Sequence, residues 1–281
     1  DNEYYFFREW FYGLHDDGER FSFFCKAILE VLPLIDFKPD IIHTNDWQTG
    51  MVSLLLDADY RKRPGGFYKN IHTLYTIHNL KYQGIFPKNI LTDCLDINWS
   101  YFNVYGVEFF DQVNFMKAGI SYSSAISTVS KTYAEEIKFD FFGENLQHDI
   151  RRRSNDLYGI INGIDIEINN PETDTQIYVN YKKDNLEGKY ENKKRLQQEL
   201  GLEVNEDIPV ISLVSRLVDQ KGLDLIEAML QELMELGIEF IVLGTGEYHY
   251  EELFKDAQYK YPERFSVNIK YDATLAQRIY A

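Results

Sequence analysis

Residues 209–226 read PVISLVSRLVDQKGLDLI, and this stretch decides the fold class. Pro209–Ser215 is a short apolar run bounded by turn residues, which indicates a strand. After a polar loop, apolar residues at spacings of three and four over Leu223–Leu236 predict a helix with one buried face. That face would consist of Leu223, Ile226, Met229, Leu230, Leu233 and Leu236. A strand followed by a helix is the repeating unit of an α/β fold with a parallel sheet.

The same alternation of strand and helix continues along most of the chain. Further strands are predicted at Asp40–His43, Thr73–His78, Ala125–Ser130, Leu157–Ile161, Glu239–Leu243 and Phe265–Tyr271. Further helices are predicted at Arg20–Ile35, Met51–Arg61, Thr132–Phe139, Lys189–Leu200, Tyr250–Tyr259 and Thr274–Ala281. Most of the strands are near-continuous apolar runs, as in a parallel sheet covered on both faces. Apolar and polar residues alternate over Phe265–Tyr271, which indicates a strand nearer an edge.

A polar segment divides this pattern in two. Residues 165–207 are rich in Asn, Asp, Glu and Lys, and a strand–helix series lies on each side of them. We therefore predict two doubly wound, Rossmann-like domains with parallel sheets, residues 1–162 and 163–281, which join near Asn162–Pro171.

Composition limits the class of protein and its partners. The 281 residues are 44% hydrophobic and 26% charged, which is typical of a soluble globular protein. There is no apolar run long enough to span a membrane, and the acidic, aromatic start of the chain does not resemble a signal peptide. Cys25 and Cys94 suggest no disulfide framework, which favours the reducing cytoplasm. The formal charge of −16 argues against nucleic acid and membrane lipid as partners.

Polar side chains gather where the predicted strands end, which is the edge at which open α/β sheets bind ligands. Asp46 and Trp47 follow the first strand, His78 and Asn79 the second, and Asn162 the fourth. Together they offer hydrogen-bonding groups and an aromatic face, which suit a sugar. The alternatives are structural: Asp46 caps the next helix, Trp47 packs against that helix, and His78 is a hydrogen-bonded core histidine.

The loop after the fifth strand carries two cations, Arg216 and Lys221, ahead of a predicted helix. Helix N-termini attract phosphate, which Arg binds through paired N–H groups and Lys through its charge. The loop is therefore a candidate diphosphate site, with two solvated cations as the alternative. Gly244 and Gly246 follow the sixth strand and either let a ligand approach the backbone or only form a tight turn.

A metal site is a weaker candidate. It would use His43, Asp46, His72 and His78, which lack the tight spacing of metal-binding motifs. We therefore expect no metal and no cofactor.

Seven segments, in this order, resemble the glycogen and starch synthase family. They are Asp16–Phe21, Pro39–Trp47, Thr76–Gly84, Phe115–Ile120, Thr128–Ala134, Gly159–Asp165 and Ser215–Leu223. They run through most of the chain and are highly specific as a set. The resemblance implies the two-domain GT-B architecture and a retaining, metal-independent hexosyltransferase. Such an enzyme moves glucose from ADP-glucose to the non-reducing end of an α-1,4-glucan such as glycogen.

The resemblance also implies roles for the matching positions. Arg216 and Lys221 would neutralise the departing diphosphate, and His78 would donate to a hydroxyl of the transferred glucose. Asp46 and Trp47 would shape the acceptor and glucose side of a cleft between the domains. The remaining substrate-binding positions would be Asn79, Asn162, Gly244 and Gly246, where the glycines let the nucleotide approach the backbone.

The chain departs from the family pattern at several places. Asn45 and Gln48 stand where the family has histidines around Asp-Trp, and Asn169 stands where a Trp is usual. The family's Lys-x-Gly-Gly-Leu loop and Glu-Pro-Cys-Gly-Leu segment are not in this sequence, so we expect a chain truncated at both ends and inactive by itself. The rivals are a sucrose- or trehalose-type synthase and an inactive glucan-binding fragment, and the tract Thr76–Gly84 favours the glucan synthases.

Overall fold

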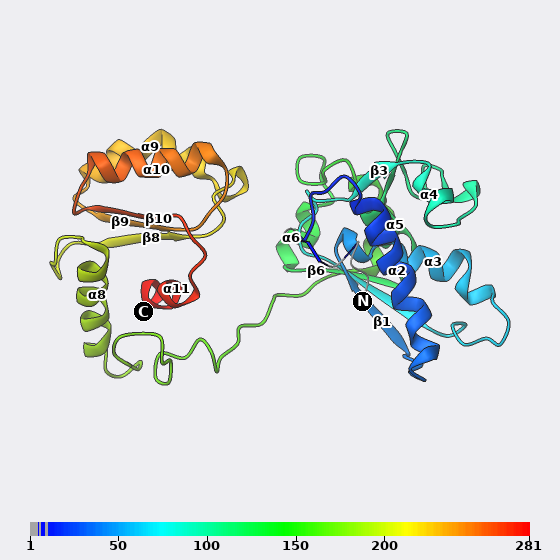
Figure 1. The fold of residues 1–281 in the computed structure, drawn as a ribbon, viewed down its shortest axis with the longest axis horizontal. Helices are drawn as coiled ribbons and strands as arrows, with labels where there is room; N and C mark the ends of the chain where they lie inside the picture. Colours follow the sequence, from blue (N-terminus) through cyan, green and yellow to red (C-terminus); the bar gives the residue numbers. More distant parts are fainter. Residues whose placement is uncertain (1–4, 6, 9–10) are drawn as a thin grey trace. The chain divides into compact units, whose positions relative to one another are not determined.

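The computed structural model describes residue 5, residues 7–8 and residues 11–281. The chain divides into two compact units, Asp1–Gly163 and Ile164–Ala281 (Figure 1). Each unit has its own parallel sheet with helices packed against it. The predicted α/β class with parallel sheets is confirmed.

The parallel sheet of the first unit has the order β1-β2-β6-β7. Its strands are β1 (Ile41–Asn45), β2 (His72–Ile77), β6 (Ala125–Thr128) and β7 (Leu157–Gly159). Each strand overlaps its predicted range, but β1 lies at an edge and its Ile41 is 60% exposed. An apolar run was therefore not sufficient to identify a strand covered on both faces.

Three helices pack together in the core of this unit. They are α2 (Asp17–Leu34), α3 (Met51–Ala58) and α5 (Phe115–Tyr122), and α3 packs against both of the others. The smaller helices are η1 (Trp47–Thr49), η2 (Tyr60–Lys62), α4 (Ile90–Asp93), η3 (Trp99–Tyr101), α6 (Lys131–Glu136), α7 (Gln147–Arg152) and η4 (Ser154–Asp156). A small antiparallel sheet, in the order β3-β5-β4, is formed by β3 (Ile85–Pro87), β5 (Gln112–Asn114) and β4 (Glu108–Phe109).

The parallel sheet of the second unit has the order β10-β9-β8. Its strands are β8 (Val210–Val214), β9 (Glu239–Leu243) and β10 (Phe265–Asn268), and its helices are α8 (Glu187–Leu200), η5 (Asp219–Lys221), α9 (Leu223–Glu235), α10 (Tyr248–Lys260) and α11 (Ala273–Tyr280). Figure 1 shows α9 and α10 on one face of the sheet and α8 and α11 on the other. The central strand β9 is buried along its whole length, and β10 is an edge strand, as predicted.

The buried face of α9 is narrower than predicted. It consists of Leu223, Ile226, Leu230, Leu233 and Met234, which pack into one hydrophobic cluster. Met229 is 54% exposed and Leu236 is 72% exposed, so the prediction that both are buried is wrong. At roughly 100° per residue, both lie about a quarter turn away from the centre of the buried stripe.

Candidate active site

In the first unit, Asp46 and His78 lie side by side where β1 and β2 end. The parallel register pairs Asn45 with Thr76, so the residues that follow are neighbours. The Asp46 carboxylate accepts a hydrogen bond from the backbone N–H of His78 at 2.8 Å. The exposed His78 ring lies with Nε2 3.0 Å from Asn45 Oδ1, an acceptor, so Nε2 carries the proton in this arrangement. The bonds from His78 to Asp46 and to Asn45 therefore hold its imidazole, which is exposed to solvent, in a fixed orientation.

The backbone of Asp46 is held in a conformation that residues other than glycine rarely adopt. Its φ is 54° and its ψ is −176°. Its N–H donates to Thr76 O at 2.9 Å, its carbonyl accepts from Thr49 N–H at 3.2 Å, and its carboxylate binds His78. Such strain costs about 1–3 kcal/mol and persists where the surroundings enforce it, often at functional sites. The helix-capping alternative for Asp46 is wrong, because α3 follows Gly50 and the Asp46 side chain makes no cap.

Trp47 is a buried side chain, with 8% of its surface exposed. Its ring packs edge-on against Phe21, with centroids 4.7 Å apart, and lies 5.7 Å from the ring of Phe86. Trp47 therefore has a packing role, but its ring contacts lie in α2 and β3 and not in the helix that follows it. Its contact with a sugar stays a prediction.

A buried polar network supports the segment that carries His78. Gln83 accepts a hydrogen bond from Asn114 at 2.6 Å and donates to the carbonyl of Glu144 at 2.8 Å. Asn114 also caps α5 by accepting from the N–H of Lys117. Sequence reasoning missed this network, although an Asn ahead of the apolar segment Phe115–Ile120 is a recognisable helix-start signal.

Two further predicted residues lie at the strand ends of this unit. Asn79 is half-buried, and its Oδ1 accepts from the N–H of Lys81 at 3.0 Å, which shapes the turn after His78. Asn162 is exposed in the extended segment after β7. The structure therefore groups Asp46 with His78 directly and gives Asn79 a role in the same loop.

In the second unit, the loop that carries Arg216 and Lys221 is anchored by the residue between them. The Leu217 side chain is fully buried in the cluster beneath α9 and α10. Its N–H donates to Thr245 O at 2.9 Å, and its carbonyl accepts from Glu247 N–H at 2.8 Å. Arg216 and Lys221 are both exposed beside this anchor.

Gly244 and Gly246 lie against the same loop. A Cβ on Gly244 would lie 1.8 Å from Ser215 O, and a Cβ on Gly246 would lie 2.1 Å from Leu217 O. Neither position accommodates a side chain while the loop keeps its place. The structure thus supplies a packing reason for both glycines that does not involve a nucleotide.

The two cations lie ahead of the N-terminus of α9. Lys221 ends η5, Gly222 follows in the left-handed conformation with φ 69°, and α9 then runs for 13 residues. Free N–H groups and the helix dipole make this end of a helix attractive to anions. Arg216, Lys221 and the helix start therefore offer what a diphosphate requires, which is positive charge and N–H donors.

The described residues contain no group of three or more His, Cys, Asp or Glu side chains that could hold a metal ion. His43 instead contacts the Thr76 hydroxyl at 2.7 Å, and His72 contacts that of Ser124 at 3.4 Å. Within the same part of the chain, no helix is long and apolar enough to cross a membrane.

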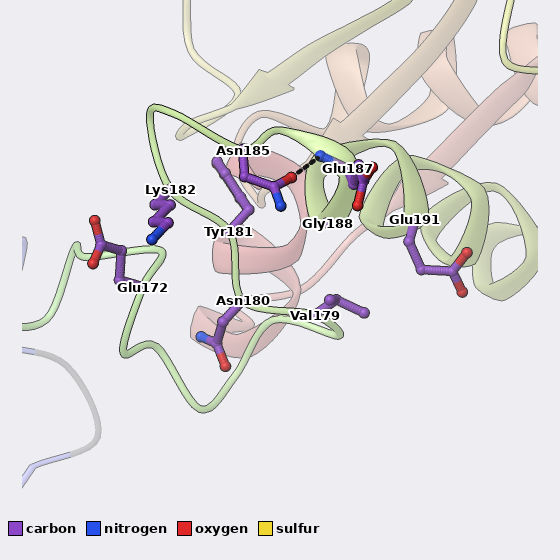
Figure 2. Close-up of a pocket in the computed structure, with 9 residues that line it drawn as sticks. All are labelled: Glu172, Val179, Asn180, Tyr181, Lys182, Asn185, Glu187, Gly188 and Glu191. Atoms are coloured by element: carbon purple, nitrogen blue, oxygen red, sulfur yellow. Dashed lines mark hydrogen bonds between the residues drawn. The ribbon is translucent and has the colours of Figure 1, made fainter.

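A cavity of about 530 Å³ lies elsewhere in the second unit (Figure 2). It is lined by Glu172, Val179, Asn180, Tyr181, Lys182, Asn185, Glu187, Gly188 and Glu191. In Figure 2, Asn185 accepts a hydrogen bond from the backbone N–H of Glu187, at 3.0 Å. None of the predicted site residues lines this cavity, and its lining carries more acid than base.

Comparisons with known proteins give a consistent result. A family model described as the starch synthase catalytic domain matches residues 1–152. The chain is 52% identical over 280 residues to a glycogen synthase of Alkaliphilus metalliredigens and 51% identical over 281 residues to one of Desulforamulus reducens. These matches cover the whole chain and 58% of each relative, so the chain spans little more than half of their length.

A solved structure is also similar. It is the catalytic domain of starch synthase IV from Arabidopsis thaliana, bound to ADP and acarbose. The TM-score is 0.89 at 34% identity, over 98% of this chain and 57% of that one.

Proposed function

The chain belongs to the starch synthase catalytic domain family, and from this premise we propose that it forms the core of a glycogen synthase. The enzyme would be a retaining hexosyltransferase that moves glucose from ADP-glucose to the non-reducing end of an α-1,4-glucan. The relatives named glycogen synthase and the ADP-bound solved structure support this choice of reaction and donor.

One observation carries the proposal: the anchored loop with two cations ahead of α9. In glucosyl transfer the bond between C1 and the diphosphate oxygen breaks, and negative charge builds up on the departing ADP. Arg216 and Lys221 would neutralise that charge from positions that the buried Leu217 holds in place. Preorganised charge of this kind is usually the largest contribution to transition-state stabilisation. No metal ion is required in this scheme.

On the first unit, His78 would donate to a hydroxyl of the transferred glucose, with its Nε2–H exchanging Asn45 Oδ1 for the sugar oxygen. The 2.8 Å bond from its N–H to Asp46 supports this role, because it fixes the backbone that carries the imidazole. Asp46 would therefore act mainly through His78, with Trp47 as the packed base of the same turn. Asn79 and Asn162 would contribute further polar contacts to the substrates.

The proposed setting is the cytoplasm. Cys25 and Cys94 are both free thiols, as is usual in a reducing compartment. A formal charge of −16 does not suit nucleic acid or anionic membranes as partners, so the proposed partners are the sugar nucleotide and the glucan.

The proposal is tested by glucose incorporation from labelled ADP-glucose into glycogen, with the full-length gene product. Arg216→Ala and Lys221→Ala should each lower kcat by roughly 10²–10³, while the KM for glycogen changes little. Lys255→Ala is the matched control, because Lys255 is an exposed cation on α10 that pairs only with its helix neighbour Glu252 in the described contacts. Rates within threefold of wild type for both loop variants would make these residues ordinary surface cations. Glycogen retention without turnover by the wild type would indicate a binding protein instead.

A further inference from the structure

An acidic residue stands between the two cations of the proposed diphosphate site. Asp219 is the first residue of η5, three positions after Arg216 and two before Lys221. A carboxylate in such a loop repels a diphosphate and competes with it for the same cations. A diphosphate site in this loop therefore requires a hydrogen-bond donor that engages the Asp219 carboxylate.

Tyr250 supplies the partner. Its hydroxyl donates to Asp219 Oδ1 at 2.5 Å, which joins α10 to the loop across 31 positions of sequence. The hydrogen bond to Asp219 raises the pKa of Tyr250 to about 12, so the hydroxyl remains a donor at every physiological pH.

The Tyr250 ring itself is firmly held. Only 3% of the residue is exposed, and its ring belongs to the cluster that contains Leu217, Leu223 and Phe254. The loop is thus fixed at two points, through the buried Leu217 side chain and through the Asp219 carboxylate. The turn between them is closed by backbone bonds from Lys221 N–H to Val218 O at 3.0 Å and from Gly222 N–H to Asp219 O at 2.9 Å.

We infer that Tyr250 and Asp219 form a clamp that sets the position of the Arg216–Lys221 loop and holds the Asp219 carboxylate toward α10, away from the bound diphosphate. Both are positioning residues, because neither has to touch the substrate. This inference rests on the proposed function, since it assigns the clamp to the donor side of that reaction. A site that holds charges in advance binds its ligand without the cost of ordering the loop.

The clamp predicts a specific pattern among variants of the full-length gene product. Tyr250→Phe keeps the ring in the cluster but releases the carboxylate, so the KM for ADP-glucose and the dissociation constant of ADP should each rise about tenfold. Asp219→Asn keeps an oxygen acceptor for Tyr250 and removes the charge, so ADP affinity should stay within threefold of wild type. Tyr250→Phe combined with Asp219→Asn should regain most of the lost affinity, because the released side chain is no longer anionic.

The rescue separates the effect of the released Asp219 charge from an effect on folding. If Tyr250 only stabilised the second unit, the double variant would bind ADP no better than Tyr250→Phe. Tyr261→Phe is the matched control, because Tyr261 is a half-buried tyrosine that follows the same helix and packs against the same cluster. It should leave ADP affinity unchanged.

Two measurements keep this test distinct from that of the proposed function. Turnover is measured with ADP-glucose, and ADP binding is measured by titration calorimetry, which needs no turnover. Full activity of Tyr250→Phe with inactive Arg216→Ala would overturn the clamp and leave the function standing. An enzyme without turnover that still binds ADP would overturn the function, while the three clamp variants would still decide the clamp. Absence of ADP binding by the wild type would overturn both.

Discussion

Replacement of Gly244 by alanine distinguishes two explanations of the Gly-x-Gly turn after β9. If the glycine serves nucleotide approach, Gly244→Ala lowers ADP affinity and leaves the fold intact. If it serves packing, the substitution destabilises the second unit even without a ligand. The structure favours the second outcome, because the added Cβ would lie 1.8 Å from Ser215 O.

The size of the effect follows from that distance. Real Cβ contacts essentially never fall below 3.0 Å, so the two backbone segments must separate by roughly 1 Å. That movement weakens the bonds from Ser215 N–H to Leu243 O and from Gly244 N–H to Asn268 O, which are both 3.1 Å long. Overpacking costs about 1–3 kcal/mol, and each hydrogen bond contributes about 1 kcal/mol. We expect the free energy of unfolding of the second unit to fall by about 3 kcal/mol.

The assay must report the second unit separately. The three tryptophans are at positions 10, 47 and 99, so tryptophan fluorescence follows only the first unit. Hydrogen exchange of the β9 amides follows the second unit. Gly244→Ala should therefore speed β9 exchange and leave the fluorescence transition in urea unchanged. The control is Gly163→Ala, because a Cβ there meets nothing within 4 Å. An unaltered β9 exchange rate in Gly244→Ala, with ADP affinity lost, would refute the packing explanation.

Two buried polar groups give the remaining predictions. Glu239 is fully buried, and burial raises the pKa of its carboxyl group. The protonated carboxyl group therefore stabilises the second unit below the unfolded-state pKa of about 4.3. This contribution is lost as pH rises through the higher pKa of the folded state. Glu239→Gln should flatten the decline of β9 protection as pH rises above the unfolded-state pKa of about 4.3, and an equally steep decline would contradict this. Asn114→Ala removes the α5 cap and the donor to Gln83, so urea unfolding followed by tryptophan fluorescence should show a loss of about 2–3 kcal/mol. Asn114→Ser, which retains a capping oxygen, should lose less, and equal losses would argue against the cap.

The sequence was sufficient for the parallel sheets because their strands are apolar runs between turn residues. It failed for α5, where Phe115 to Ile120 are all buried. A helix buried on every side has no polar face, so the 3.6-residue period that reveals a surface helix is absent. The strands β3, β4 and β5 were missed for a different reason, because segments of two or three residues are too short for any alternation to be visible.

Among the site residues, sequence identified chemical type and position along the chain but not the atom that each group meets. Asp46 was expected either to bind a sugar or to cap a helix. It makes no cap, and one of its carboxylate oxygens accepts from His78 N–H, a contact that the sequence did not indicate. That contact depends on the register of two parallel strands and on a φ of 54°, and neither is encoded locally. The contact of Tyr250 could not be predicted for the same reason, because its partner Asp219 lies 31 positions away in sequence.

These contacts separate the residues at the strand ends into exposed groups and residues that support them. The exposed groups His78, Arg216 and Lys221 are each supported by a buried or strained residue that fixes the backbone. Asp46 does this for His78, and Leu217 does so for the two cations. In the proposed site, removal of an exposed group would delete one interaction with a ligand, whereas removal of its support would leave the group present but misplaced. Rate losses from support variants should therefore be recoverable by changes that restore the backbone position, and losses from the exposed groups should not.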